Sequence, residues 1–251
     1  MIFSDLKTQS QNMLNDVNIF LPSDELETVL NEAQRLVCLL TFCFEKYKSS
    51  ADWGGVISAY QPIFPVPSDC IAPLFVYDSD NEQRIYPAKL SQFELSGSSW
   101  ESDTGANYQN YCLFDPTYNT PSTNGSETGC FRNNTMLVYP LVNTTSMQIN
   151  MLYAASSPTM DSDDDVLSIP PGYDSCLLDY LMFYAWTKRK SQMAMQEGLT
   201  KLQNFFATVN MLGEMMKSKY PSGRDFEPAP VELIVERFNL TYQSEQQQKQ
   251  Q

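Results

Sequence analysis

Two segments with the periodicity of amphipathic helices lie at opposite ends of this chain, and turn-rich sequence separates them. In the first segment, apolar residues recur three and four positions apart, as one buried face of a helix requires: Leu26, Val29, Leu30, Ala33, Leu36, Val37 and Leu40. The second begins at Pro170-Pro171-Gly172-Tyr173-Asp174 and continues through Leu178, Leu181, Met182, Ala185 and Trp186. Neither helix can bury its apolar face alone, so we expect the two ends to pack together around an inserted middle domain.

The predicted fold class is α+β. A helical bundle formed by the N- and C-terminal helices would carry an inserted antiparallel β domain and an extended C-terminal arm. The predicted limits are 1–50 for the first part of the helical stem, 51–165 for the β-rich domain, 166–220 for the second part of the stem and 221–251 for the arm.

Start and stop signals set the expected helix ends. Residues 4–16 fit a short opening helix that stops near Asn18. Ser23 is placed to cap the second helix, with two acids in its first turn, and this helix should reach about Tyr47. From Asp174 the helical pattern runs to about Lys217, and we expect Gly198 to bend or split it.

The middle of the chain has short apolar runs rich in Val, Ile, Tyr and Phe, with turn clusters between them. This pattern predicts a small antiparallel sheet or sandwich. Asp78-Ser79-Asp80-Asn81 is typical of a hairpin tip, and Pro116 to Gly129 of a mobile surface loop. The expected strands are Cys70–Tyr77, Arg84–Phe93, Tyr108–Phe114, Thr135–Val142 and Met147–Tyr153.

Charge and hydropathy exclude several classes of function. Sixteen Lys and Arg against 30 Asp and Glu give a formal charge of -14, which repels phosphate backbones and anionic lipid. The longest strongly apolar run, Val37 to Phe44, is far shorter than the roughly 20 residues of a membrane helix. The start of the chain has no signal-peptide pattern, so we expect no export and six reduced, mostly buried cysteines.

The residues that most enzymes depend on are missing. The chain contains no histidine, the commonest general base and the usual activator of serine or cysteine nucleophiles. It also has no Gly-rich phosphate-binding pattern and no C-x-x-C pair. We therefore predict no catalytic residue, no cofactor and no metal, although a carboxylate pair of the glycoside hydrolase type stays open.

Three clusters allow two interpretations each. Asp161 to Asp165 could bind calcium but lacks the EF-hand spacing, so a solvated linker is favoured. Lys188-Arg189-Lys190 is interpreted as a solvated face, with contact to an acidic neighbour as the alternative. The methionines at 193, 195, 211, 215 and 216 could form an adaptable binding surface, but packing in a core or a subunit seam is favoured.

The segment from Val231 to Phe238 alternates like a β-strand, yet it lies alone between a Pro-rich stretch and a Gln-rich end. A lone strand gains most by adding to the edge of another sheet. That sheet could belong to its own insert or to a neighbouring chain, and we favour the neighbour.

Several segments together resemble the head-to-tail adaptor (connector, or ring) proteins of tailed bacteriophages. They are SDLKTQSQNMLND at 4–16, LPSDELETVLNEAQR at 21–35 and LSIPPGYDSCLLDYLMFYAWTKRKSQ at 167–192, with a β-rich middle. The most telling pieces are Asn31-Glu32-Ala33-Gln34-Arg35 and the start at Ile169 to Asp174, which leads into Leu178, Tyr180, Tyr184 and Ala185. The large insert is similar to that of short-tailed phages, whose adaptor also presents fibres or a nozzle.

This resemblance implies a non-enzymatic virion protein in the neck, assembled in the host cytoplasm. Its copies would form a dodecameric ring beneath the portal protein, carry the tail nozzle or fibre proteins, and let DNA pass through the lumen without specific binding. The helical bundle would form the head-to-tail contacts between copies. The arm from Pro221 to Leu240 would contact the portal or the next subunit through Phe226, Val231, Leu233, Val235 and Phe238.

Two other classes of protein stay open. A carbohydrate- or receptor-binding virion protein would act through the β insert and stack Trp53, Trp100, Tyr108 and Tyr111 on sugars, although such aromatic residues more often fill β cores. A secreted host protein would instead pair its cysteines in disulfides.

Overall fold

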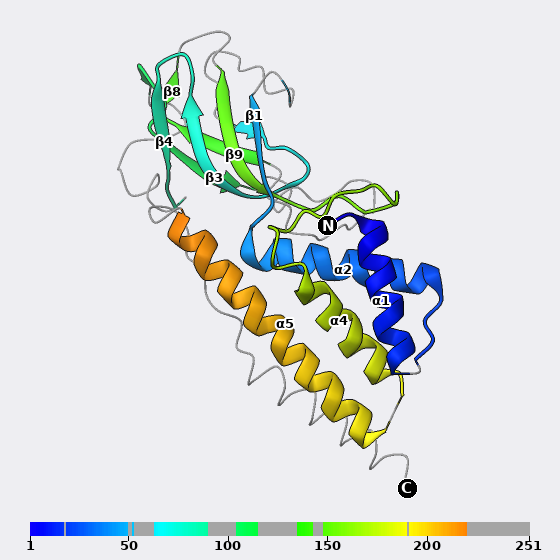
Figure 1. Ribbon diagram of the computed structural model, residues 1–251. Coiled ribbons are helices and arrows are strands. Elements are labelled where there is room, and N and C mark those ends of the chain that lie inside the picture. The colour runs from blue at the N-terminus through cyan, green and yellow to red at the C-terminus, as the bar shows by residue number, and fades with distance from the viewer. Residues whose placement is uncertain are drawn as a thin grey trace, which may run out of the picture. The chain divides into compact units, whose positions relative to one another are not determined.

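The computed structural model describes residues 1–17, 19–49, 52, 63–89, 104–114, 135–142, 148–189 and 191–219 (Figure 1). The chain divides into two compact units. The helical unit combines Met1–Phe44 with Ser156–Gln251, and the sheet unit comprises Glu45–Ala155. The predicted α+β class, with helices at both ends and a β insert, is therefore confirmed. Whether the units fold as independent domains within the predicted limits stays a prediction.

The helical unit is built around one central apolar helix. Its elements are α1 (Phe3–Asp16), α2 (Ser23–Thr41), α4 (Ser175–Thr187) and α5 (Gln192–Lys219). The central helix, α4, contacts each of the other three (Figure 1). The side chains of Leu177, Leu181 and Ala185 on α4 are fully buried. Across from them, α2 contributes the predicted apolar face, which includes Leu30 and Val37.

Two predictions about α2 are wrong. Ser23 is its first helical residue, and neither Ser23 nor Pro22 caps it through a side-chain hydrogen bond. The helix also ends at Thr41 instead of near Tyr47, because Phe42 adopts a left-handed conformation (φ 54°) and donates its N–H to the Cys38 carbonyl at 2.8 Å. Beyond this point, Glu45–Ser49 forms strand β1, which gains its hydrogen bonds from β9 (Ile149–Ala155).

The break in the C-terminal helical segment also differs from the prediction. It falls between Thr187 and Gln192, whereas Gly198 lies inside α5. A Cβ atom placed on Gly198 would lie 3.2 Å from Trp186 Cβ and 3.4 Å from the Phe183 carbonyl oxygen. Gly198 therefore allows close packing of α5 against α4.

The sheet unit is a mostly antiparallel sheet. The order of its seven strands is β1-β9-β3-β4-β6-β7-β2, and β5 pairs separately with β8. The remaining strands are β2 (Ile63–Pro65), β3 (Cys70–Asp78), β4 (Gln83–Pro87), β5 (Thr104–Gly105), β6 (Asn110–Phe114), β7 (Thr135–Tyr139) and β8 (Leu141–Val142). The β4–β6 and β5–β8 pairs are parallel, unlike the predicted antiparallel arrangement.

The hairpin predicted at Asp78–Asn81 joins β3 to β4. The Asp78 carboxylate accepts hydrogen bonds from the backbone N–H groups of Asp80 and Asn81, at 3.0 and 3.2 Å, and so holds the turn together. The predicted strand Thr135–Val142 is divided at Pro140, which has no N–H to donate. The sequence did not predict β1, β2 or β5, and Pro116–Gly129 lies outside the described residues.

Candidate partner-binding surfaces

The five predicted contact residues of the arm, Phe226, Val231, Leu233, Val235 and Phe238, lie outside the described residues. Their role stays a prediction. The surfaces that the structure does describe come from α2 with the connector 156–174, from α5, and from the solvent-facing side of the sheet unit.

Two amide side chains of α2 hold the connector in place. Asn31 donates from Nδ2 to the Met160 carbonyl at 3.1 Å and accepts from the Met160 N–H at 2.7 Å. The fully buried Gln34 donates to the Pro158 carbonyl at 3.3 Å and accepts from the Ser168 N–H at 2.9 Å. These contacts explain why Asn31 and Gln34 stand three residues apart, since this spacing puts both on one side of a helix. Both belong to the signature segment Asn31–Arg35.

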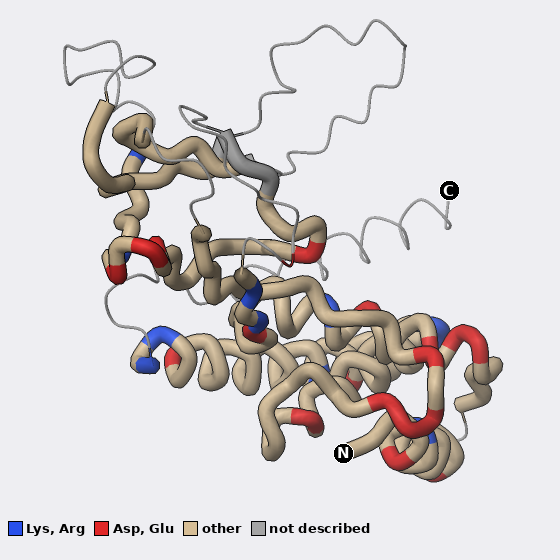
Figure 2. The backbone as a smooth tube through the Cα atoms, turned by 90° about the horizontal axis from the view of Figure 1, so that it is seen from above, with Lys and Arg blue, Asp and Glu red and all other residues tan. Residues whose placement is uncertain are grey.

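The acidic cluster Asp161–Asp165, whose Asp residues are among those coloured red in Figure 2, is exposed at 161–164 and half-buried at Asp165, and it also orders the start of α1. The Asp163 and Asp165 carbonyls accept from the Ser4 and Phe3 N–H groups, at 3.1 and 2.9 Å. Hydrogen bonds from the Ser162 and Asp161 backbones hold the pKa of Asp165 below its usual value. In the part of the chain that the structure describes, no group of Cys, Asp or Glu side chains is arranged to hold a metal ion.

An acidic groove of about 540 Å³ runs between α2 and the connector. Asn31 and Met160, which fix the connector to α2, both line it. The charged side chains that line it are Asp24, Glu27, Glu32, Arg35 and Asp161. Carboxylates outnumber the single guanidinium, so this surface disfavours contact with phosphate groups.

The basic cluster at Lys188–Lys190 is only partly the solvated face that the sequence suggested. Lys188 pairs with Glu25 of α2, and Arg189 donates to the Val17 carbonyl. The hydroxyl of Tyr184 also donates to Glu25, at 2.6 Å. Together, Lys188 and then Tyr184 lower the pKa of Glu25. The alternative interpretation, contact with an acidic neighbour, is therefore right for Lys188, while Lys190 lies outside the described residues.

The methionines of α5 divide into two groups. Met216 is buried and Met195 packs partly against the core, as predicted. Met193, Met211 and Met215 are instead 76%, 65% and 41% exposed. Positions 193 and 211 differ by five full helical turns, so both lie on the same outer side of α5.

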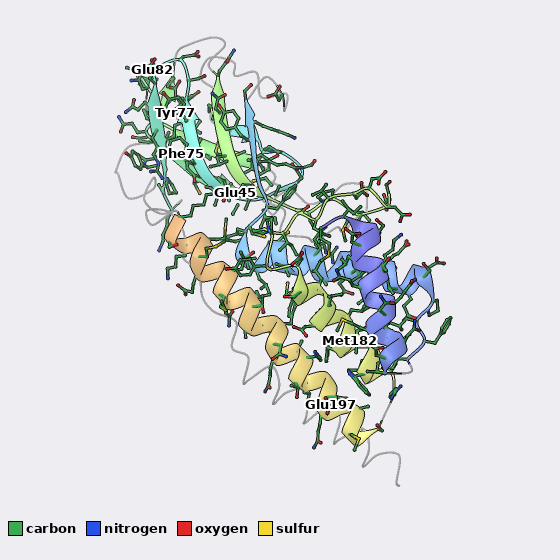
Figure 3. All side chains as sticks on the ribbon, in the orientation of Figure 1. Glu45, Phe75, Tyr77, Glu82, Met182 and Glu197 are labelled. Atoms are coloured by element: carbon green, nitrogen blue, oxygen red, sulfur yellow. The ribbon has the colours of Figure 1, made fainter. Side chains whose placement is uncertain are left out.

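An exposed group of aromatic residues lies on the solvent-facing side of the sheet unit. Phe75 and Tyr77 are neighbours along β3 (Figure 3), and their rings stack with centroids 6.1 Å apart. The Arg84 guanidinium lies 4.9 Å from the Phe75 ring centroid and 5.2 Å from the Tyr86 centroid. We call Tyr47, Phe75, Tyr77, Arg84 and Tyr86 the aromatic–arginine face.

Strand register brings these residues together. Tyr77 pairs with Arg84, and Leu152 of β9 lies between Tyr47 on β1 and Phe75 on β3. The alternating residues of β3 and β4 point the other way: Val76 and Ile85 are 1% and 0% exposed. The sequence alone does not reveal the aromatic–arginine face, because the exposure of these side chains depends on the strand register.

The aromatic residues that the sequence did single out lie elsewhere. Tyr108 is 0% and Tyr111 is 6% exposed, so both belong to the core of the sheet unit, and burial raises the pKa of each to about 12. Neither can stack on a sugar in this conformation. Trp53 and Trp100 lie outside the described residues.

The features described so far define a class of protein: a small helical bundle with a β unit inserted between α2 and α4. The family model of the SU10 adaptor protein matches residues 1–225, and the chain belongs to this family of structural bacteriophage adaptors. The match ends one residue before Phe226. A search of curated proteins gave no match. No described helix is long and apolar enough to cross a membrane.

Proposed function

We infer that this chain is a head-to-tail adaptor whose copies form a ring between the portal protein and the tail. Membership of the adaptor family carries this inference, because the match covers both parts of the helical unit and the insert. The ring is proposed to be a dodecamer in the neck of a short-tailed phage, assembled in the host cytoplasm and without enzymatic activity or cofactor. Its tail-side partners would be nozzle or fibre proteins.

The ring would also line the channel through which DNA leaves the head. A channel wall must let the duplex slide without holding it. The net charge of -14 supports this role, because an acidic wall repels phosphates. The acidic groove beside α2 and the exposed carboxylates of the connector have the charge that such a wall needs.

The C-terminal arm is proposed to grip a partner through Phe226, Val231, Leu233, Val235 and Phe238. The strand-like pattern from Val231 to Phe238, in which Val231, Leu233 and Val235 would share one side, supports this role, since it suits a strand that covers an apolar surface.

Electron microscopy of the purified chain, alone and mixed with the portal protein of the same phage, tests the proposal. Annular particles that stack on portal rings are the expected result. A chain that lacks residues 221–251 should keep its circular dichroism spectrum but lose docking. Particles that stay monomeric with portal present, at concentrations where portal rings are intact, would refute the adaptor ring.

A further inference from the structure

We propose that the aromatic–arginine face of the sheet unit binds the segment Val231–Phe238 of a neighbouring copy. The inference rests on the proposed ring, which places copies side by side. It identifies the surface that the arm of one copy contacts on the next. The partner is therefore a second copy of this chain, bound through an apolar and acidic segment.

The face has the composition of a protein-binding surface. Tyr47, Phe75 and Tyr86 are 63%, 36% and 55% exposed, although each offers a large apolar area. Tyrosine and arginine are also the residues that most often dominate binding energy at interfaces. Scattered exposed apolar residues need no explanation, but here the Phe75 and Tyr86 rings contact one guanidinium and Phe75 also stacks on Tyr77, so these residues form a contiguous patch.

Arg84 adds a charge requirement to this surface. Its guanidinium lies over the Phe75 and Tyr86 rings. A guanidinium forms its strongest hydrogen bonds with a carboxylate. The occupant should therefore bring a carboxylate between apolar side chains.

The segment 231–238 has this pattern. If it is extended, as its alternation predicts, Glu232, Ile234, Glu236 and Phe238 share one side, and Val231, Leu233 and Val235 share the other. Of the gripping residues proposed for 231–238, only Phe238 would therefore contact this face. Glu232 or Glu236 could pair with Arg84 while Ile234 and Phe238 cover the rings.

The length of chain after α5 allows the segment to reach another subunit. Helix α5 ends at Lys219, and residues 220–230 can span up to roughly 40 Å when extended. Charge favours contact between copies at this face. Two chains of net charge -14 repel each other, and the face offers a cation without a carboxylate among its own five residues.

Photo-crosslinking of the full-length chain tests the proposal. A p-benzoylphenylalanine at position 86 replaces one exposed aromatic side chain by another, so the fold should survive. Equal amounts of chain grown with 14N and with 15N are mixed, irradiated and digested with trypsin. We expect cross-links from position 86 to the peptide 225–237, with mixed isotope labels that show a contact between two copies. The same probe at Phe20, which is 87% exposed in the helical unit, is the control and should not capture that peptide.

Electron micrographs of the same sample separate this inference from the proposed ring. Rings without cross-links to 225–237 would overturn the docking surface and leave the ring intact. Cross-links within one isotope label only, or to other segments, would overturn the neighbouring-copy contact. Absence of both rings and cross-links would overturn both proposals.

Charge reversal gives an independent measurement. Arg84→Glu should lower the mixed-label cross-link yield about tenfold, because a carboxylate would then face Glu232 or Glu236. Adding Glu232→Arg and Glu236→Arg to the same chain should restore most of the yield, measured for all variants as cross-linked dimer on a denaturing gel because the new arginines add trypsin sites. Loss of yield without restoration, in a chain with a native circular dichroism spectrum, would contradict the pairing.

Discussion

Asn31 and Met160 exchange two hydrogen bonds: the Asn31 side chain donates to the Met160 carbonyl and accepts from the Met160 N–H. The two residues are 129 positions apart, and the whole sheet unit lies between them in the sequence. One amide thus satisfies both backbone groups of Met160 and fixes the returning chain against α2.

Asn31→Ala should destabilise the helical unit by about 1–3 kcal/mol, because it leaves both backbone groups of Met160 without their partner. Urea unfolding followed by circular dichroism measures this change. Asn204→Ala, at an exposed position of α5, is the matched control and should shift the midpoint little. Equal urea midpoints for the two variants would show that water replaces the hydrogen bonds that the Asn31 side chain makes with Met160.

Gly198→Leu should destabilise the helical unit by about 1–3 kcal/mol, since even a Cβ at this position meets Trp186 and the Phe183 carbonyl. Leucine has the higher helix propensity, so a loss of stability would come from packing and not from the helix itself. Thermal unfolding of this variant is compared with that of Thr200→Leu, which places the same side chain at an exposed site of α5. A Gly198→Leu protein as stable as that control would contradict the close contact.

Asp69 should make the sheet unit sensitive to acid. Burial acts to raise its pKa, but hydrogen bonds from Lys46 at 2.7 Å and Tyr153 at 2.9 Å hold it below the usual value, with help from Lys48. A lowered pKa contributes stability above the unfolded-state pKa of about 4, and this contribution disappears as the pH falls through the folded-state value. The stability lost between about pH 6 and pH 2 should therefore be smaller in Asp69→Asn than in the parent chain.

Asp164→Asn serves as the exposed control. An unchanged pH dependence in Asp69→Asn would rule out this role.

The cysteines of the helical unit should differ in reactivity. Hydrogen bonding with Cys43 and burial raise the pKa of the Cys38 thiol, and burial raises that of Cys176 to about 12. Alkylation proceeds through the thiolate, so both should react slowly.

Cys43 is half-buried and should be labelled first in the folded chain, while urea should remove the difference. Mass spectrometry of the tryptic peptide 36–46, which contains both Cys38 and Cys43, resolves the order. Labelling of Cys38 before Cys43 would be inconsistent with this packing.

The helices were predictable because their signals are local. The spacing of Leu26, Leu30 and Val37 sets the buried face of α2 without reference to the rest of the chain. Strand β1 was not predictable in this way, because Glu45–Ser49 is a strand only through its pairing with β9, more than 100 positions later. Tertiary pairing there outweighs the helical pattern that precedes it.

The candidate surfaces were less predictable than the fold. The bonds made by Asn31 and Gln34 join positions far apart, and nothing local marks the partners. The exposure of Tyr86 and the burial of Tyr108 follow from strand register, which a list of aromatic residues does not contain. The sequence predicts that Gly198 bends or splits its helix. In the structure, Gly198 instead lets α4 approach α5 closely.

The first and last strands of the sheet unit, β1 and β9, are paired partners, with Glu45 directly opposite Ala154. The polypeptide therefore departs from the bundle and returns to it at adjacent points. The segment between these two residues can therefore be lengthened, shortened or replaced while the packing of α1, α2, α4 and α5 is preserved. A phage adaptor can thus acquire a new insert without redesign of its helical unit.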